Sequence, residues 1–458
     1  MRSRPPPRRW PFLGRPKGAS FGARPGERPE VSGFGQVAVI GAGWAGLACA
    51  VELAAAGRPV VVFEASRRLG GRARSVELDG RLVDNGQHLL VGAYAETLRL
   101  IGRTGADPAQ LFWRLPLRLD YPGAFRLRLP ELPPPWHLAA GLLAAESASL
   151  RDKLSAALFM QRLKLDGFRL RRDTTVAAWL DAHRQHGAIR RFLWEPLCLA
   201  ALNTAPQRAS AQIFANVLRD SLGGPRGATD LLLQRSDLGR IFPEHAAHYL
   251  TEKGSEIRCA HRVRDLQRQG NGWQVDGRQV DQVVLAVAPQ HVPALLVSRP
   301  AHEPLLRQIA DYDYEPIATV YLAYPEAVRL PFPMLGLTGP LGQWVFDRSS
   351  QGGPAGLLAF VLSAEGGWET LTDDELAATL HAELCAALGP LPPPRWQRSI
   401  RERRATFRCR PDLPRPGCET AERGLWLAGD YTCSEYPATI EGAVRSGVAA
   451  ARAVLAGK

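Results

Sequence analysis

The sequence predicts an α/β protein in which a dinucleotide-binding domain of parallel strands is interleaved with a second domain of α+β type. Two observations predict it. Residues 36–64 form one strand–turn–helix–strand unit around a glycine-rich turn, and residues 280–289 are an apolar, β-branched run typical of a further buried strand. The long segments between and after them lack a second such turn and supply the α+β part.

The first unit is complete within thirty residues. The uncharged run 36–40 is typical of a buried strand, residues 47–56 of a helix that Gly57 ends, and residues 60–63 of a second strand. Strand, glycine-rich turn, helix and strand in this order make the Rossmann-like unit that binds dinucleotides.

Each glycine of the turn has a separate task. Gly41 permits the tight turn, Gly43 lets the backbone approach a pyrophosphate, and Gly46 lets the helix pack closely on the strand. The amides at the start of the helix, around Trp44 and Ala45, then offer unpaired N–H groups and a partial positive charge to the phosphates.

Glu64 ends the second strand, eighteen residues after Gly46. An acidic side chain at that place accepts hydrogen bonds from the ribose hydroxyls of an adenosine. The unit therefore predicts a site for an adenine dinucleotide. No second fingerprint appears that would indicate a built-in nicotinamide reductase.

Composition excludes several classes of protein. Of the 458 residues, 45% are hydrophobic and 22% charged, which is too apolar for a disordered chain, and the 44 Gly and 37 Pro follow no period. No uncharged apolar run reaches the ~20 residues of a membrane-spanning helix. We therefore expect a protein that is soluble or bound to a membrane surface.

The net charge of +12 is unevenly distributed, because residues 1–35 carry eight basic and two acidic side chains. We expect this basic, Pro-rich segment to be either a disordered extension or the result of a start position assigned too far upstream. Arginine outnumbers lysine 52 to 5, which indicates a general compositional bias rather than selection for binding nucleic acid. No basic run is interleaved with aromatic residues, as a groove that stacks bases would require. Nucleic acid is therefore not an expected partner. The basic residues either form a solvated surface or attract the protein to an anionic membrane, and both interpretations stay open.

Cysteine and histidine usage indicates neither disulfides nor metal. The seven cysteines lie far apart without a Cys-x-x-Cys pair, and the ten histidines are dispersed. Free thiols fit a reducing compartment, so we expect a cytoplasmic location.

Four segments together resemble the FAD-dependent amine oxidase and phytoene desaturase superfamily, whose FAD-binding domain is of the glutathione-reductase type. They are residues 41–72, residues 84–88, the stretch around Val263, and the closing segment 424–447. The resemblance implies noncovalent FAD. The residues that it implies are Ala65 beside Glu64, Gly71 and Arg72 at the pyrophosphate, Gly86, Gln87 and His88 at the isoalloxazine, Val263 at the adenine, and Gly429 and Asp430 at the ribityl and phosphate region.

The closing segment also has a physical logic of its own. Thr439 can cap a helix that runs from about 440 to 455. With Ala438 and Ile440, the start of that helix would face the flavin pyrimidine and stabilise the negative charge that collects there on reduction.

Within the superfamily the chain resembles the squalene-associated FAD desaturases of hopanoid synthesis, the hydroxysqualene dehydroxylases, over residues 36–458. Residues 84–90, 194–204 and 437–442 carry this resemblance. It implies a discontinuous FAD-binding domain and an interleaved substrate domain. Their expected segments are 36–95, 236–290 and 411–458 for FAD, and 96–235 and 291–410 for the substrate.

The implied reaction replaces an allylic hydroxyl of a long isoprenoid by hydride from reduced flavin and gives squalene. Expected partners are the isoprenoid, an external electron donor, neighbouring squalene-pathway enzymes, and the cytoplasmic membrane as a peripheral contact. A carotenoid-type desaturase, an amine oxidase and a non-catalytic, flavin-bound membrane scaffold stay open as alternatives.

The departing hydroxyl needs a proton, and His88 and Glu195 are the candidate acids. A histidine beside a glycine turn is also typical of a hydrogen-bonded structural residue. Glu195 lies in an almost uncharged run, where it is either a buried acid or the partner of a neighbouring arginine.

The region expected to bind the substrate differs from the dinucleotide-binding unit in its sequence pattern. We expect residues 111–135 to be irregular, residues 138–165 to form one amphipathic helix, and strands and a helix at 318–324, 357–363 and 373–388. The 138–165 helix is either core or a membrane-docking element, with Trp136 as anchor and Leu142 and Leu143 as apolar contacts. Its basic residues are Arg151, Lys153, Arg162 and Lys164. The apolar stretches are likewise either ordinary core or an isoprenoid tunnel.

Overall fold

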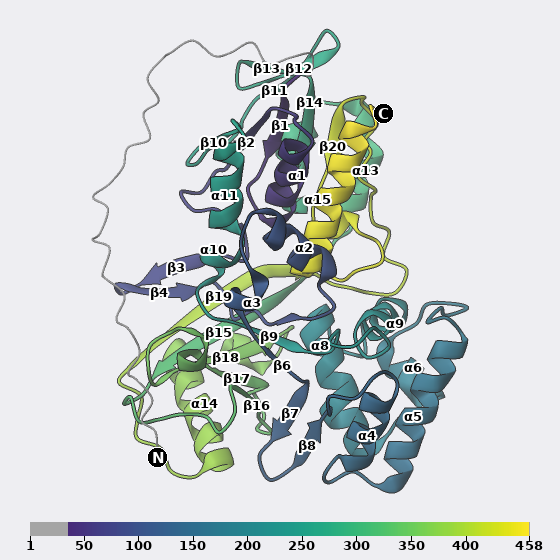
Figure 1. Cartoon of the computed structure of the whole chain (residues 1–458), viewed down its shortest axis with the longest axis vertical. Helices are drawn as coiled ribbons and strands as arrows, with labels where there is room; N and C mark the ends of the chain where they lie inside the picture. Colours follow the sequence, from purple (N-terminus) through teal and green to yellow (C-terminus); the bar gives the residue numbers. More distant parts are fainter. Residues whose placement is uncertain (1–34, 458) are drawn as a thin grey trace, which may run out of the picture. The chain divides into compact units, whose positions relative to one another are not determined.

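Five parallel strands form the central sheet of the computed structural model, which describes residues 35–457 (Figure 1). Their order is β10-β2-β1-β14-β20. The bounds are Val37–Ile40 for β1, Val60–Phe63 for β2, Glu256–Arg258 for β10, Gln282–Leu285 for β14 and Leu425–Leu427 for β20. The strands come from three distant parts of the chain, as the sequence predicts for a Rossmann-like sheet.

Alternate residues of these strands bury opposite faces of the sheet. Val37 and Val39 pack with helices α1 (Trp44–Ala55), α11 (Pro243–Glu252) and α15 (Ile440–Leu455). Ala38 and Ile40 join the cluster that contains Trp273 of the small antiparallel sheet β11-β12-β13. That sheet comprises Leu266–Gln269, Gly272–Val275 and Arg278–Val280. Both faces are covered, which is why the strands read as uninterrupted apolar runs.

A second, antiparallel sheet has the order β16-β17-β18-β15-β19. Its strands are Tyr314–Ala323 (β15), Met334–Gly336 (β16), Trp344–Asp347 (β17), Leu357–Ser363 (β18) and Trp396–Phe407 (β19). Helix α14, Asp373–Leu388, packs on one face. On the other face Thr319, Val361 and Trp344 lie side by side, because Val361 pairs with both of its neighbours and paired residues share a face.

The remaining elements form small sheets and a helical layer. The sheets are β3 (Ser75–Leu78) with β4 (Arg81–Asp84), β5 (Leu90–Val91) and β6 (Phe112–Leu115) with β9 (Leu231–Gln234), and β7 (Arg118–Tyr121) with β8 (Phe125–Arg128). The layer contains α4 (Trp136–Ala144), α5 (Leu150–Leu165), α6 (Val176–Ala182), α7 (Gly187–Ile189), the π-helical turn η1 (Arg190–Trp194), α8 (Glu195–Leu202) and α9 (Ala211–Asp220). Short helices elsewhere are α2 (Ala95–Arg103), α3 (Pro108–Leu111), α10 (Leu238–Ile241), α12 (Pro293–Leu296) and α13 (Glu303–Ala310).

Two predictions for this region are wrong. Residues 111–135 contain β6, β7 and β8 instead of irregular chain. In β8, for example, Phe125 and Leu127 are buried whereas Arg126 and Arg128 are exposed, but the prolines around these strands obscure such alternation in the sequence. The single helix over 138–165 is two helices, because Ala145 leaves helical geometry and Ser149 starts α5 as its N-cap.

Other element predictions are confirmed. β15, β18 and α14 match the expected strands and helix, and α15 begins directly after its Thr439 cap. Residues 35–457 form one compact unit, so the two-domain division stays a proposal. The prediction for 1–35 lies outside the described residues except at Gly35. No helix between residues 35 and 457 has the length and apolar character that crossing a membrane requires.

Candidate active site

The glycine-rich turn between β1 and α1 is closed on both sides by backbone. Gly41 has a φ of +107°, and a Cβ there would lie 2.6 Å from the carbonyl oxygen of Ala286. A Cβ on Gly46 would lie 1.9 Å from the carbonyl oxygen of Gly41. The turn therefore requires glycine at both positions, as predicted.

Gly43 and Gly71 form an open cradle above this turn. A Cβ on Gly71 would lie 3.1 Å from the Gly43 Cα, whereas a Cβ on Gly43 would meet nothing closer than the Gly71 Cα at 3.9 Å. Gly43 is also the N-cap of α1 and provides no side-chain cap, so the amides of Ala45 and Gly46 keep their hydrogen-bonding capacity, while Gly43 forms a parallel bridge with Gly70 just before Trp44. Backbone N–H groups at a helix start next to a gap without side chains fit a pyrophosphate.

The acidic end of β2 lies on one side of this cradle. The Glu64 carboxylate accepts hydrogen bonds from Ala42 N at 2.8 Å and Ser66 N at 2.7 Å. The Glu64 carbonyl accepts one from His261 N at 2.8 Å, which brings in the segment that carries the buried Val263. Ala65 is exposed beside it. The structure thus brings Glu64, Ala65 and Val263 to one end of the site, where an adenosine would lie.

Arg72 and Asp430 lie on the opposite side of the cradle. Their side chains form an ion pair of 2.7 Å, and Arg72 also donates to the carbonyl of Ala405 at 2.6 Å. The hydroxyl of Tyr431 next to them is buried and has no hydrogen-bond partner among the described residues. A dinucleotide extends to both sides of its pyrophosphate. A dinucleotide with its adenosine at Glu64 would have its flavin half on the Arg72 side, where the Tyr431 hydroxyl and the Arg72 guanidinium would fit it.

The closing helix meets the first one at this site. A Cβ on Gly447 would lie 2.1 Å from the carbonyl of Ala45, so α15 packs directly on α1. Thr439 caps only the Gly442 amide, at 3.1 Å, which leaves the amides around Ile440 at the helix start, after Ala438. Gly429 donates its own amide to Ser446 Oγ at 2.9 Å, which ties the Gly429-Asp430 turn to α15.

Residues 85–88 adjoin the Arg72 side, because the Asn85 side chain donates to the Arg72 carbonyl at 3.3 Å. His88 Nδ1 lies 2.7 Å from the carbonyl oxygen of Gly86. A carbonyl can only accept, so Nδ1 carries the proton and neutral His88 presents Nε2 as an acceptor. Burial lowers the pKa of His88 below its ordinary value, despite the hydrogen bond to Gly86, which raises it. Neutral His88 is therefore suited to accept a hydrogen bond and unsuited to donate a proton.

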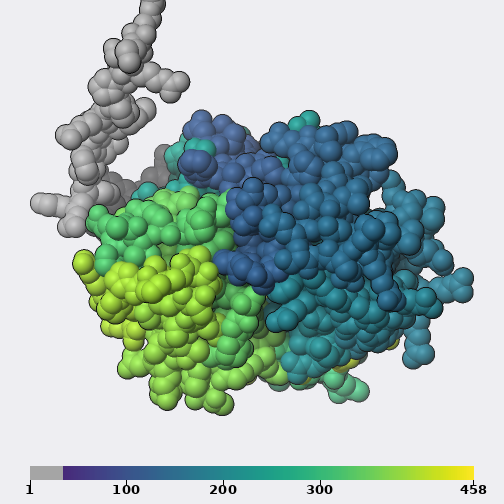
Figure 2. Space-filling view, turned by 90° about the horizontal axis from the view of Figure 1, so that it is seen from below, coloured from purple at the N-terminus to yellow at the C-terminus, as the bar shows by residue number. Residues whose placement is uncertain are grey.

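Glu195 lies elsewhere. Its carboxylate pairs with Arg190 at 2.7 Å, as one of the two readings of the sequence predicts. It lines a cavity of about 300 Å³ between the helical layer and the second sheet. Other lining residues include the aromatic side chains Tyr121, Phe192 and Trp344. Figure 2 shows the three contributing regions on one face, with blue residues between the green sheet and the teal helices.

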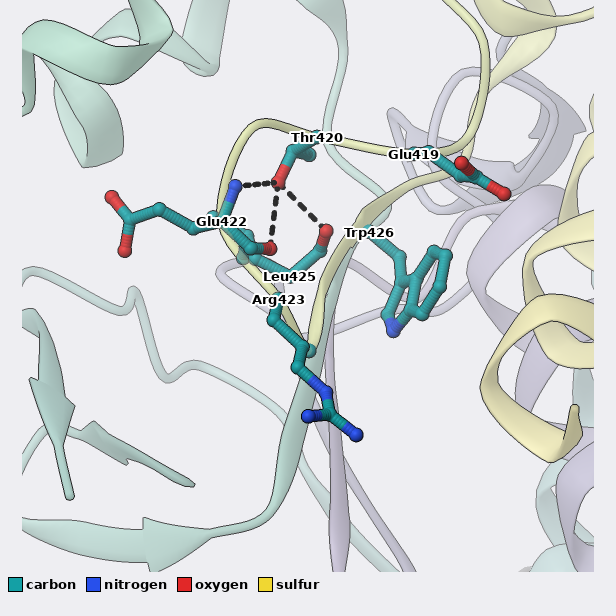
Figure 3. Close-up of a pocket in the computed structure, with 7 residues that line it drawn as sticks. Glu419, Thr420, Glu422, Arg423, Leu425 and Trp426 are labelled. Carbon is teal, nitrogen blue, oxygen red and sulfur yellow. Dashed lines mark hydrogen bonds between the residues drawn. The ribbon is translucent and has the colours of Figure 1, made fainter. Parts of the chain in front are cut away.

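A second hollow, of about 250 Å³, lies at the amino end of β20 (Figure 3). Thr420 stabilises the turn that precedes β20. Its hydroxyl donates to the Leu425 carbonyl at 2.8 Å and accepts from the Glu422 amide at 3.2 Å. Ligands of open α/β sheets bind at the carboxyl ends of the strands, and Gly429, not Thr420, lies at that end of β20. This hollow therefore belongs to a local turn rather than to the candidate site.

Sequence reasoning missed the side chains beneath residues 85–88. The Asp84 carboxylate is fully buried and pairs with Arg348 at 2.9 Å, and Arg348 donates to Gln87 at 2.7 Å. Asp84 was visible as part of a motif, but nothing in the chain around Arg348 marks it. Gln87 itself points into this network, so a cofactor can contact it only through its backbone.

Comparison with known proteins identifies relatives. A family model described as "Flavin containing amine oxidoreductase" matches residues 44–455. A hydroxysqualene dehydroxylase of Rhodopseudomonas palustris is 34% identical, with 92% of this chain and 98% of that protein covered. A 15-cis-phytoene desaturase of Synechococcus elongatus is 23% identical over 92% of this chain and 96% of its own length.

Solved structures share the fold at lower identity. Cyclohexylamine oxidase from Brevibacterium oxydans superimposes with a TM-score of 0.65 at 20% identity, covering 92% of this chain and 99% of that one. The expected glutathione-reductase-type fold of the amine oxidase family is thereby confirmed.

Proposed function

Because the chain belongs to the family of flavin-containing amine oxidoreductases and, within it, to the hydroxysqualene dehydroxylases, we propose that it removes the hydroxyl of hydroxysqualene reductively and releases squalene. The protein is an FAD-dependent oxidoreductase, so the non-catalytic scaffold is not retained. Desaturation is not favoured, since the phytoene desaturases are the more distant relatives. The single observation that carries the choice of substrate is the 34% identity over nearly the whole length of both chains.

The reaction consumes one hydride and one proton. FAD, when bound in its reduced form, would supply the hydride and would thereby be oxidised. At the substrate the C–O bond breaks, a C–H bond forms, and the oxygen takes a solvent-derived proton and leaves as water. An external two-electron donor must then restore the reduced cofactor, and this donor is a further partner in the proposal.

In this proposal the residues of the chain bind the cofactor and orient the substrate. The cradle of Gly43 and Gly71 and the start of α1 hold the pyrophosphate, Glu64 holds the ribose, and Arg72 with Asp430 borders the flavin half. His88 Nε2 accepts the hydrogen bond of the substrate hydroxyl and thereby orients the C–O bond. Glu195 is assigned to the cavity wall, not to proton transfer, because Arg190 already neutralises it.

The pH dependence tests the assignment of His88. A hydrogen-bond acceptor must be neutral, and the pKa of His88 is lowered by burial. We expect the rate of flavin oxidation by substrate to stay constant through neutral and alkaline pH and to fall in acid, as pH drops through that lowered pKa. Stopped-flow rates across pH measure this. A rate that instead falls as pH rises through the same region means that His88 is an acid. In either case, the His88→Phe variant should lose the pH dependence that is due to His88.

A row of side chains on the second sheet connects the cavity wall with residues 85–88. Trp344 lines the cavity, and Val361 and Thr319 continue the row on the same face of the sheet. Thr319 Oγ1 accepts a hydrogen bond from Gln87 N at 3.2 Å, so the row ends beneath residues 85–88. Two strand spacings separate the ends of the row, about 10 Å. The aromatic lining of the cavity suits an apolar isoprenoid better than a small polar amine.

Helix α5 presents a leucine stripe to the surroundings. Leu150, Leu154, Leu158 and Leu165 are 51 to 74% exposed. At 100° per residue they fall within about 80° of the helix circumference. Arg151 and Arg162 flank one edge of this stripe, and Lys153 and Lys164 flank the other. The opposite face, including Phe159 and Leu163, is buried, so core packing and an apolar surface coexist on one helix.

We propose that this leucine stripe docks on an anionic membrane surface, where the water-insoluble substrate resides. An apolar stripe between two rows of cations is complementary to acyl chains below anionic headgroups. The exposed Trp136 at the start of α4 is a further anchor. The cytoplasmic face inferred from the sequence belongs to the same proposal.

Serine at Leu154 and Leu158 should weaken vesicle binding without unfolding. Half-burial of each leucine in the membrane is worth about 1 kcal/mol, so the double variant should bind anionic vesicles roughly thirty-fold more weakly. Co-sedimentation measures this, and the wild type should release partly as salt rises above about 0.1 M. Leu142 is only 2% exposed and is core, so the pair suggested by sequence, Leu142 and Leu143, is unsuitable.

The control replaces two exposed leucines elsewhere, Leu82 and Leu455, which are 45% and 43% exposed, against 51% and 71% for Leu154 and Leu158. Their double serine variant should bind vesicles like the wild type, with a similar thermal midpoint. Equal vesicle binding by all three proteins would place the membrane contact on another surface.

The experiment that tests the function is turnover of hydroxysqualene under anaerobic conditions with chemically reduced enzyme. Squalene should form in proportion to enzyme-bound flavin. Formation of no squalene, with the flavin still reduced, would contradict the proposal.

A further inference from the structure

A buried ion pair lies directly beneath residues 85–88. Asp84 is 0% exposed and Arg348, which begins the turn η4 (Arg348–Gln351) after β17, is 5% exposed. The Asp84 carboxylate accepts from Arg348 Nη2 at 2.9 Å, Gln234 Nε2 at 3.0 Å and Leu238 N at 2.8 Å. Asp84 is therefore fully occupied and balances the charge of the guanidinium.

The other arm of the guanidinium fixes Gln87. Arg348 Nη1 donates to Gln87 Oε1 at 2.7 Å and to Gln351 Oε1 at 2.6 Å. Arginine has no acceptor, so the oxygen of the Gln87 amide must face it and the nitrogen must face away. That nitrogen donates to Gln351 Oε1 at 3.0 Å and to the carbonyl of His88 at 3.2 Å.

This directional chain ends at the proposed reaction site. The orientation of Gln87 fixes the His88 carbonyl, and the Gln87 amide N–H is held by Thr319 Oγ1 at 3.2 Å. The backbone of residues 86–88 in turn holds the His88 ring, through its Nδ1 and the Gly86 carbonyl. These hydrogen bonds connect Arg348 through Gln87 to the backbone on which the His88 ring is held.

We propose that Arg348 is a positioning residue that holds residues 85–88, and with them His88 Nε2, against the flavin half of the site. The inference rests on the proposed flavin site and deepens it. Arg348 contacts neither cofactor nor substrate in this assignment; it acts through Gln87. A lysine in its place has one compact ammonium, which cannot reach Asp84 and Gln87 together with the geometry of a guanidinium.

The test compares Arg348→Lys with Arg408→Lys. Arg408 donates to the fully buried Glu315 at 2.7 Å and so serves as a matched buried pair on the same sheet. We expect both variants to lower the thermal midpoint and to retain FAD. Only Arg348→Lys should change the visible spectrum and midpoint potential of the bound flavin. Only it should slow flavin oxidation by hydroxysqualene, by roughly ten- to a hundred-fold at unchanged KM.

Gln87→Leu keeps the proposal testable if Arg348→Lys does not fold. It leaves the Arg348–Asp84 pair intact and removes the hydrogen bonds of the Gln87 side chain to Arg348, Gln351 and the His88 carbonyl, so it should give the same spectral and kinetic change with a smaller loss of stability. Flavin spectra and potentials equal to wild type in both variants would overturn the proposal. These readouts do not require hydroxysqualene, so failure of the wild type to turn over that substrate would be recognised separately.

Discussion

Valine at Gly43 should produce a folded protein that is colourless after purification. The Cβ position of Gly43 meets nothing closer than 3.9 Å within the protein, so the substitution is compatible with the fold. It points at Gly71, however, and fills the cradle in which the pyrophosphate must approach the backbone. Because the amides at the start of α1 then lose contact with the phosphates, flavin binding should fall below detection.

The measurement is the flavin content of purified protein together with its circular dichroism and thermal midpoint. Gly102→Val is the matched control, since Gly102 is exposed on α2 and an added Cβ meets nothing within 4 Å. That control should be yellow. A Gly43→Val protein with full flavin occupancy would contradict the location of the pyrophosphate.

Alanine at Glu64 should weaken FAD binding by roughly ten- to a hundred-fold, the cost of losing hydrogen bonds to a charged acceptor, about 1.5–3 kcal/mol. Glu64→Gln keeps the shape and one acceptor oxygen, so its loss should be at the mild end. The structure adds a second effect, because the carboxylate also accepts from the amides of Ala42 and Ser66. The alanine variant therefore loosens the turn as well as the ribose contact.

Titration of apoprotein with FAD measures both variants. Their order, wild type tighter than Gln and Gln tighter than Ala, follows from the number of acceptors that remain. Unchanged affinity in both variants would remove Glu64 from the cofactor site.

The parts that sequence reasoning predicted are those in which one contiguous segment carries its own physical signal. The first turn is such a segment, because Gly41 and Gly46 face backbone at distances that exclude any side chain. Helix α15 is another, since the Thr439 cap and the small residue Gly447 define its start and its packing face.

The parts that were missed depend on contacts between distant segments. Arg348 and Asp84 are 264 residues apart, and nothing local to Arg348 distinguishes it from the many other arginines of this chain. The strands β7 and β8 are short and form a two-stranded sheet, so the prolines around them outweighed their alternation. The break before α5 is set by the Ser149 cap, which stands inside an otherwise helical pattern.

The candidate acids show the limit of residue type as a guide. His88 lies on the Arg72 side of the site, and its Nδ1 contact with the Gly86 carbonyl leaves Nε2 as an acceptor in the neutral ring, so its role as acid or acceptor stays a proposal. Glu195 lies on the cavity wall with Arg190 as its partner. Hydrogen-bond direction, which sequence does not contain, supports the roles proposed for both residues.

The most direct test of the central claim is a single-turnover experiment. The flavin is reduced under anaerobic conditions, mixed with hydroxysqualene, and followed by the return of oxidised-flavin absorbance, with the product analysed in the same sample. The account predicts full reoxidation with one squalene formed per flavin. Flavin that remains reduced with hydroxysqualene, or reoxidation without squalene, would contradict it.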